Sequence, residues 1–240
     1  MSKIKWWDEY EIKARYIPTF IAFVPLVHFL ILLLGESFWK DLTENISWML
    51  VIANFSLSLI LMLAFVQLQC GFAKHWIEES VFGKGGERFP TTDMLLYKGG
   101  LISFERKEQL RARITLEFEC VLSTKNEENN NPLNARLQAR EAVSFVRAAV
   151  GKGIMTLQYN IRYGFFRNII GGVIWGSIGS FGCAIIYGIG NKWGPMSFFI
   201  VFLVVYLTIY FLKKVVLEKF AFTYADTLYN EFLNKYKGNK

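Results

Sequence analysis

The residues in this sequence that are best suited to chemistry are arginines at helical spacing. Arg136, Arg140 and Arg147 recur in LNARLQAREAVSFVRAAV at intervals that place them in one row along a helix. The planar guanidinium group of arginine is well matched to phosphate. The row therefore predicts a binding site for anionic lipid headgroups or for a phosphorylated or nucleic-acid ligand. Pairing with the chain's own acidic residues is the alternative interpretation.

A second basic segment, SFERKEQLRARITLEFE, also has the pattern of a helix. Three apolar residues at helical spacing form a narrow stripe along it: Leu110, Ile114 and Phe118. Basic residues flank this stripe on both sides: Arg106, Lys107, Arg111 and Arg113. A flanked stripe of this kind is typical of a helix that lies on a membrane surface. We include these four cations and Arg162 in the predicted ligand site.

Catalytic residues are sparse in this sequence. Its two histidines, His28 and His75, lie far apart, and it has no motif of a hydrolase, a nucleotide-binding enzyme or a metalloprotease. Its three cysteines occur at unrelated spacings, which favour neither a disulfide framework nor a metal site. The sequence therefore predicts a protein that is not an enzyme and that needs neither a cofactor nor a metal.

The apolar residues of the chain are concentrated in blocks. Of its 240 residues 53% are hydrophobic, and the formal charge is +7. A transmembrane helix needs about 20 apolar residues in succession. Four segments reach that length, namely residues 16–34, 46–68, 169–189 and 195–212. The sequence therefore predicts an all-α membrane protein with four transmembrane helices.

The placement of Lys and Arg predicts how these helices are oriented. Basic residues flank the first and fourth apolar segments, and fifteen of them lie in residues 69–168. Positive charge favours the cytoplasmic side of a membrane, so we expect both termini to be cytoplasmic in a bacterial inner membrane. The expected parts are a first hairpin (1–68), a cytoplasmic insert (69–168), a second hairpin (169–212) and an amphipathic tail (213–240).

Other segments of the insert and the tail have weaker patterns. We expect FGKGGERFPTT to form a loop and NEENNNP to form a linker or an exposed turn. The segment MTLQYNIRY is interpreted either as a short strand, which would add minor β structure, or as a lead into the third span. In the tail, apolar residues at four-residue spacing predict a stripe that packs on another element: Phe220, Tyr224, Leu228 and Phe232.

Small residues recur in the third predicted span, within RNIIGGVIWGSIGSFGCAIIYGIG. Glycine lowers the hydropathy of a span but lets helix backbones approach closely, which favours helix association in lipid. Packing inside one subunit, contact between subunits and lining of a pore all fit this pattern. The residues that we assign to helix packing or to a pore are Gly172, Gly176, Gly179 and Ser180, together with Asn54 and Ser58 of the second span.

The segment NIRYGFFRN precedes the third span. Its arginines and aromatic rings suit the membrane interface, so an anchor is one interpretation. The other is a coupling element that transmits a shift of the insert to the third span. The residues predicted for that coupling are Tyr163, Gly164, Phe165 and Arg167.

The combination of FPTTDMLLYKG, the arginine-bearing helix and NIRYGFFRN before a span resembles the membrane effectors of Hailong-type anti-phage defence systems. The resemblance covers mainly residues 88–190. It implies a multi-span protein that oligomerises and opens an ion-conducting path, under control of a nucleotide or oligonucleotide made by a partner nucleotidyltransferase. It assigns no individual ligand residues, so the site residues above rest on charge and placement.

These features together predict a gated ion channel or membrane-permeabilising effector in the lipid bilayer. We expect a homo-oligomer and assume that it is a tetramer. We expect the controlling ligand or partner to bind at the cytoplasmic insert. Two alternatives stay open. One is a non-conducting scaffold that recruits a cytoplasmic partner, and the other is a small-solute transporter, which the charge-free spans disfavour.

Overall fold

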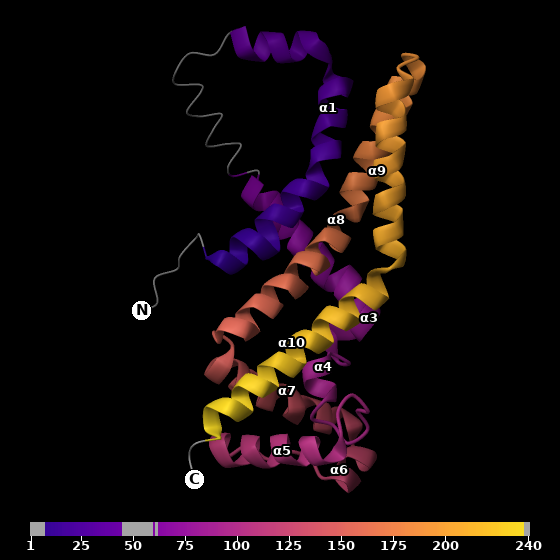
Figure 1. The fold of residues 1–240 in the computed structure, drawn as a ribbon. Helices are drawn as coiled ribbons and strands as arrows, with labels where there is room; N and C mark the ends of the chain where they lie inside the picture. The colour runs from indigo at the N-terminus through magenta and orange to yellow at the C-terminus, as the bar shows by residue number, and fades with distance from the viewer. Residues whose placement is uncertain (1–7, 45–59, 61, 238–240) are drawn as a thin grey trace. The chain divides into compact units, whose positions relative to one another are not determined.

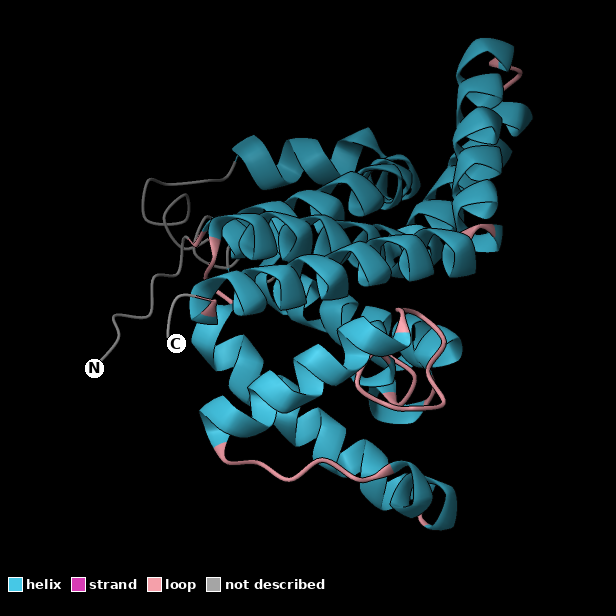
Figure 2. Ribbon diagram, turned by 60° about the horizontal axis from the view of Figure 1, so that its bottom comes forward, coloured by secondary structure: helices cyan, strands magenta, loops and turns pink. Residues whose placement is uncertain are grey.

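Helices are the only regular elements in the part of the chain that is described by the computed structural model, residues 8–44, 60 and 62–237 (Figures 1 and 2). The prediction of an all-α protein is confirmed for these residues. The segment MTLQYNIRY lies in α8 (Ile154–Ile189), so it leads into the third predicted span and the alternative of a short strand is wrong.

Contacts between residues divide the chain into two compact units. Unit 1 comprises Met1–Ile77 and Gly164–Lys214, and unit 2 comprises Glu78–Tyr163 and Val215–Lys240. The division therefore falls inside two long helices, α8 and α10 (Lys213–Tyr236), and before the last residue of η2. The other helices of unit 1 are η1 (Glu11–Tyr16), α1 (Ile17–Glu44), a helix over 62–72, η2 (Ala73–Glu78), which extends one residue into unit 2, and α9 (Trp193–Phe211).

Three helical stretches of the described chain are long and apolar enough to cross a membrane. They are Glu11–Gly35, Ile154–Ile189 and Trp193–Phe211. They contain the first and third predicted spans and all but the last residue of the fourth. The second predicted span, residues 46–68, lies for the most part outside the described residues. The described residues thus include three helices that fit the hydrocarbon thickness of a bilayer.

A proline shapes the first of these stretches. Pro25 has no N–H group, so the carbonyl oxygen of Ile21 loses its partner within α1. The hydroxyl group of Tyr206 in α9 donates a hydrogen bond to that oxygen at 3.2 Å. Because water is scarce in a bilayer, a side chain from a neighbouring helix has to satisfy the freed carbonyl group.

Glycines of α8 let this helix lie directly against α1. A Cβ atom added at Gly172 would lie 2.3 Å from the Cβ atom of Ala22. One added at Gly179 would lie 2.2 Å from the backbone nitrogen of Leu26. Both distances are far below van der Waals contact, so neither position has room for a larger residue without movement of the backbone.

A further small position of α8 faces α9. A Cβ atom added at Gly176 would lie 2.4 Å from the ring of Tyr206, and Ser180 is fully buried. The small residues of this span are therefore occupied by contacts within the chain. Of the three interpretations of the glycine pattern, packing inside one subunit is the one that describes these contacts.

Unit 2 is assembled around α7 (Pro132–Val150). One face of α7 is buried, and it consists of small residues at helical spacing: Ala135, Ala139, Ala142, Val143 and Val146. The other helices that lie wholly in this unit are α3 (Glu79–Phe82), η3 (Lys84–Gly86), α4 (Pro90–Asp93), α5 (Phe104–Phe118) and α6 (Lys125–Asn130). The two helices predicted from basic segments are thus present as α5 and α7.

The apolar stripes of α5 and α10 are buried inside unit 2. Leu110 and Ile114 of α5 are both 0% exposed, so this stripe packs against protein rather than lying on lipid. The ring of Phe118 stacks on Phe232 of α10, with 5.8 Å between centroids. The stripe predicted for the tail therefore has its packing partner in the insert.

The segment predicted as a linker, NEENNNP, is mostly helical. Thr124 and Glu127 form a capping box: the Thr124 hydroxyl accepts from the Glu127 backbone at 3.3 Å, and the Glu127 carboxylate accepts from the Thr124 backbone at 2.7 Å. This box starts α6, although the residues that follow are poor helix formers. The prediction was wrong because it weighed composition and passed over the T-x-x-E signal.

Replacing Gly179 with alanine should destabilise the packing of α8 on α1. The added methyl group would overlap the backbone at Leu26, which should lower the free energy of unfolding by about 1–3 kcal/mol. Gly71→Ala is the matched control, because nothing lies within 4 Å of a Cβ atom there. Thermal unfolding in detergent measures both variants. Equal melting temperatures for Gly179→Ala and the unmutated protein would contradict the packing.

Candidate functional site

Lys107, one of the predicted ligand residues, lies inside unit 2. It is 3% exposed, and its ammonium group donates to the carbonyl oxygens of Leu96, at 2.5 Å, and of Gly99. Burial lowers the pKa of Lys107, and the carboxylate of Glu128 opposes that shift. The lysine therefore ties together the turn that joins α4 to α5.

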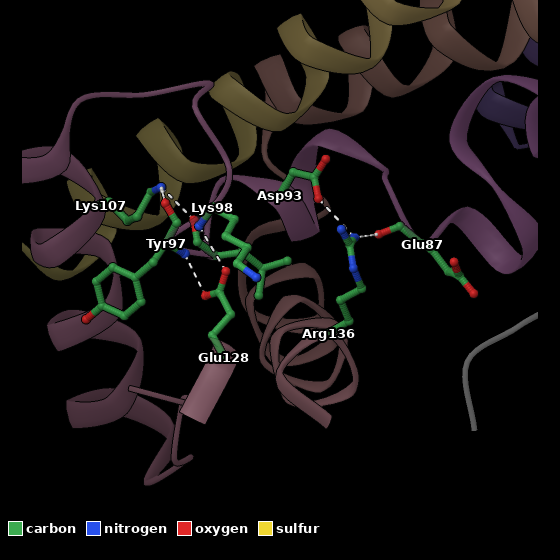
Figure 3. A network of polar contacts seen from close by, with 8 residues as sticks. Glu87, Asp93, Tyr97, Lys98, Lys107, Glu128 and Arg136 are labelled. Carbon is green, nitrogen blue, oxygen red and sulfur yellow. Dashed lines mark hydrogen bonds and ion pairs between the residues drawn. The ribbon is translucent and has the colours of Figure 1, made fainter. Parts of the chain in front are cut away.

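Glu128 of α6 binds the backbone N–H groups of the same turn. It is 2% exposed, and its carboxylate accepts hydrogen bonds from the backbone nitrogens of Tyr97, at 2.7 Å, and Lys98, at 2.9 Å. Figure 3 shows Lys107 and Glu128 reaching the turn from different directions. The carbonyl groups and the N–H groups of the turn are thus each paired with a buried charge of suitable sign.

Arg111 adds a third buried contact at this turn. Its guanidinium group donates to the carbonyl oxygens of Leu95, at 2.5 Å, and of Ser123, and lies 4.4 Å from the ring centroid of Tyr97. Both terminal nitrogens are engaged with the main chain. A phosphate group would therefore have to break contacts of the fold to reach Arg111 or Lys107.

The other two cations predicted on α5 are paired with polar side chains. Arg106 forms an ion pair with Asp226 of α10 at 2.7 Å and donates to Asn230 at 2.9 Å. Arg113 pairs with Glu117, one turn further along α5, at 3.2 Å. For these arginines, pairing with the chain's own acids describes the contacts.

The arginine row of α7 begins with a residue that contacts both α4 and the turn before it. Arg136 donates to the carbonyl oxygen of Glu87 at 2.5 Å and to the carboxylate of Asp93 at 3.1 Å (Figure 3). Burial raises the pKa of Asp93, and the guanidinium group of Arg136 opposes the shift. Arg136 thereby holds the loop that carries Glu87 against α7.

Arg140, one turn beyond Arg136, is exposed beside the glycine-rich turn of η3. One guanidinium nitrogen lies 3.7 Å from the Cβ position of Gly85, and Nε of Arg88 lies 3.6 Å from that of Gly83. Lys84, between these two glycines, is exposed as well. We call Lys84, Arg88 and Arg140 the cation cluster.

The turn that carries the cation cluster depends on glycine and contains two nearby carboxylates. Gly83 and Gly85 have φ values of 79° and 63°, in the left-handed region that favours glycine. The backbone nitrogen of Gly85 donates to Glu79 at 3.4 Å, and a Glu87 carboxylate oxygen lies 3.8 Å from the Cβ position of Gly83. These three cations outnumber the two carboxylates, and the third carboxylate near Arg88, that of Asp93, is paired with Arg136, so the turn carries net positive charge.

The remaining predicted cations have other contacts. Arg147 donates to the hydroxyl group of Thr91 at 3.3 Å, and its guanidinium carbon lies 5.7 Å from the ring centroid of Tyr224. Arg162 is exposed and lies 5.1 Å from the ring centroid of Tyr159. The structure thus does not join the eight predicted cations into a single row. Sequence analysis missed Lys84 and Arg88, whose signal was two cations inside a glycine-rich run.

The predicted coupling residues lie where α8 passes from unit 2 to unit 1. The hydroxyl group of Tyr163 donates to Glu78 at 2.8 Å in unit 2. A Cβ atom added at Gly164 would lie 2.9 Å from that of Ala14 in unit 1. Phe165 and Arg167 follow in α8 and are half-buried. Of the residues assigned to packing or a pore, Asn54 and Ser58 lie outside the described residues.

His28 has partners within unit 1. Its Nε2 atom lies 2.8 Å from the hydroxyl group of Tyr187, and its ring stacks on Phe199 with 5.2 Å between centroids. A hydrogen bond of this kind satisfies an imidazole inside a span. Among the residues that the structure describes, no group of three or more His, Cys, Asp or Glu side chains is arranged to hold a metal ion.

Comparison with known proteins adds no relative: no family model, no curated protein and no solved structure matches this chain. The class that the fold defines, over the described residues 8–44, 60 and 62–237, is an all-helical protein with three helices able to cross a membrane.

Replacing Glu128 with glutamine should loosen the turn between α4 and α5. The two backbone N–H groups bind different oxygens of the Glu128 carboxylate, and glutamine keeps only one of these oxygens. The substitution also removes a negative charge beside Lys107. We expect the amides of Tyr97 and Lys98 to exchange hydrogen at least about tenfold faster, which corresponds to about 1.4 kcal/mol of local stability. Hydrogen–deuterium exchange of the full chain measures this.

Glu141→Gln is the control for that substitution, because Glu141 is an exposed residue of α7. It should leave exchange in the turn unchanged. Equal exchange rates at residues 97 and 98 in both variants would show that Glu128 does not hold the turn.

Proposed function

We propose that this chain is an oligomeric membrane effector that opens an ion path when a phosphate-bearing ligand binds the cation cluster. In this proposal residues 46–68 form a fourth span, both termini are cytoplasmic, and unit 2 faces the cytoplasm of a bacterium. The resemblance to Hailong-type effectors supports a role in anti-phage defence, with a nucleotide or oligonucleotide from a partner nucleotidyltransferase as the ligand.

The observation that carries the proposal is the cation cluster itself. Most predicted basic residues are engaged with carbonyl groups or acids, as the contacts of Lys107, Arg111 and Arg106 illustrate. Arg140 and Arg88 are exposed at one glycine-rich turn. Guanidinium groups bind phosphate in pairs of parallel hydrogen bonds, and glycine leaves the backbone of the turn accessible. The cluster therefore suits a compact, multiply charged anion.

The spans support an ion path between subunits rather than through one subunit. The glycine positions of α8 are filled by α1 and α9, which leaves little room for a pore inside the chain. In the most apolar window of α9, only 11% of residues are buried. The rest of this window is not covered by the described residues, so it suits contact with lipid or with a second copy, as an oligomeric effector requires.

The helix that supports coupling is α8. Its residues 154–163 belong to unit 2 and its residues 164–189 belong to unit 1. Tyr163, with its hydrogen bond to Glu78, and Gly164, packed on Ala14, are neighbours in the chain. A ligand that shifts unit 2 would in this proposal act on the span through these two residues.

Purified protein in liposomes should conduct ions only when a suitable anion is present. The test measures potassium efflux with inorganic phosphate, nucleotides and short oligonucleotides on the side of unit 2. Replacing both Arg88 and Arg140 with glutamine should raise the half-maximal concentration of the active anion about 10- to 100-fold, because charge-assisted hydrogen bonds are lost.

Lys125→Gln is the matched control, since Lys125 is an exposed cation of α6 in the same unit. It should respond to the anion like the unmutated protein. No efflux with any anion would favour the scaffold, and saturable solute uptake would favour the transporter. An unchanged response of the double variant would remove the cation cluster from the proposal.

A further inference from the structure

The outward face of α7 carries two leucines that the described residues of the chain leave uncovered. Leu133 is 64% exposed and Leu137, one turn further along the helix, is 53% exposed. The alanines and valines that pack α7 into unit 2 lie on the opposite side of the helix. Apolar side chains at helical spacing on an exposed face are typical of a surface that binds another helix.

Segments of unit 2 border this face on both sides. On one side, Arg136 donates to the carbonyl oxygen of Glu87 at 2.5 Å. On the other side, the hydroxyl group of Ser123 donates to Oε1 of Gln138 at 2.5 Å. The exposed residues between these borders recur at intervals of three or four, and we call them the open stripe: Leu133, Leu137, Glu141, Ser144 and Ala148.

The open stripe is complementary to a second copy of itself in the antiparallel direction. A two-fold axis that crosses α7 between residues 140 and 141 places Leu133 opposite the partner's Ala148. The same axis places Leu137 opposite the partner's Ser144, and Glu141 opposite the partner's Arg140, which is exposed at the edge of the stripe. Each large side chain then meets a small one, each carboxylate meets a cation, and the symmetry makes every contact twice.

The charges on this face disfavour other arrangements. A parallel pair of α7 helices would bring Glu141 against the partner's Glu141, and like charges that face each other repel. A bilayer surface rich in anionic lipid would repel the same carboxylate. Arg140 and Glu141 do not pair within one helix, because adjacent residues project in different directions. Of these arrangements, the antiparallel second copy is the one that pairs both charges.

We propose that the open stripe binds the open stripe of a second copy of this chain, with the two α7 helices antiparallel. The pairing lies in unit 2 and depends neither on ion conduction nor on a bound anion. It uses Arg140, which also belongs to the cation cluster. Its test therefore omits phosphate and nucleotides and is separate from the efflux test of the proposed effector.

Disulfide formation in the full chain tests the pairing. Cysteines at positions 137 and 144 of one helix stand about 10.5 Å apart, which is too far for a disulfide within the helix. Across the two-fold axis each faces the other, so Leu137→Cys with Ser144→Cys should form a covalent dimer under mild oxidation. Either variant alone should not, because like positions are also about 10.5 Å apart along the helix axis.

Two features of the design exclude other disulfides. All variants carry Cys120→Ser, which removes the cysteine of unit 2, and Cys70 and Cys183 are buried. Gln109→Cys with Leu116→Cys is the matched control, since these exposed residues stand seven positions apart on α5 of the same unit. This control should form no covalent dimer.

Two outcomes of the disulfide test would overturn the proposal. A self-linked dimer of either single variant would show that the helices pair in the parallel direction. No covalent dimer of the double variant would show that a second copy does not occupy the stripe. If Leu137→Cys is then shielded from a water-soluble thiol reagent, lipid or a different protein covers this face.

Charge reversal provides a second measurement, which introduces no cysteine. Glu141→Arg should raise the dissociation constant of the dimer at least about tenfold, because it places a cation opposite Arg140 at two symmetry-related contacts. Adding Arg140→Glu should restore the unmutated value, since both charges are then reversed. Sedimentation of the full chain in detergent at several concentrations measures the three proteins. Equal dissociation constants for Glu141→Arg and the unmutated chain would contradict the pairing.

Discussion

Close approach between helix backbones is the constraint on which unit 1 depends. Apolar side chains do not drive helices together in lipid, because the lipid tails are equally apolar. Gly172 and Gly179 instead bring α8 into direct contact with α1, and Gly176 receives the ring of Tyr206. The same tyrosine satisfies a carbonyl group freed by Pro25. Small residues and backbone hydrogen bonds therefore do in this unit what a hydrophobic core does in water.

Unit 2 uses positive charge mainly to hold its own backbone. Lys107 and Arg111 bind carbonyl groups of one turn, and Glu128 binds the N–H groups of the same turn. Buried charges are stable only when they are paired in this way. Some arginines, such as Arg140, stay exposed at the surface. Exposure, and not residue type, separates them from the arginines that hold the backbone.

The candidate site could be predicted only in part. Arg140 belongs to the row that the spacing on α7 indicated, but Lys84 and Arg88 come from a segment that resembled an ordinary loop. Lys107 and Arg111 had the same pattern as surface cations, yet they are 3% and 8% exposed. Charge and periodicity show which face of a helix a residue occupies, and they do not show whether a distant turn covers that face.

The sequence by itself determined the longer helices, because helical periodicity and apolar length are local properties, but it did not indicate the short helices η3, α4 and α6. It identified α5, α7 and three stretches able to cross a membrane, and it placed small residues on α8. Only the tertiary structure decided which partners those faces meet. Glu128 accepts a hydrogen bond from the backbone of Tyr97, 31 residues away in the sequence. Gln69 donates one to the backbone of Asn168, 99 residues away. Contacts over such distances depend on how the whole chain packs, which no local pattern contains.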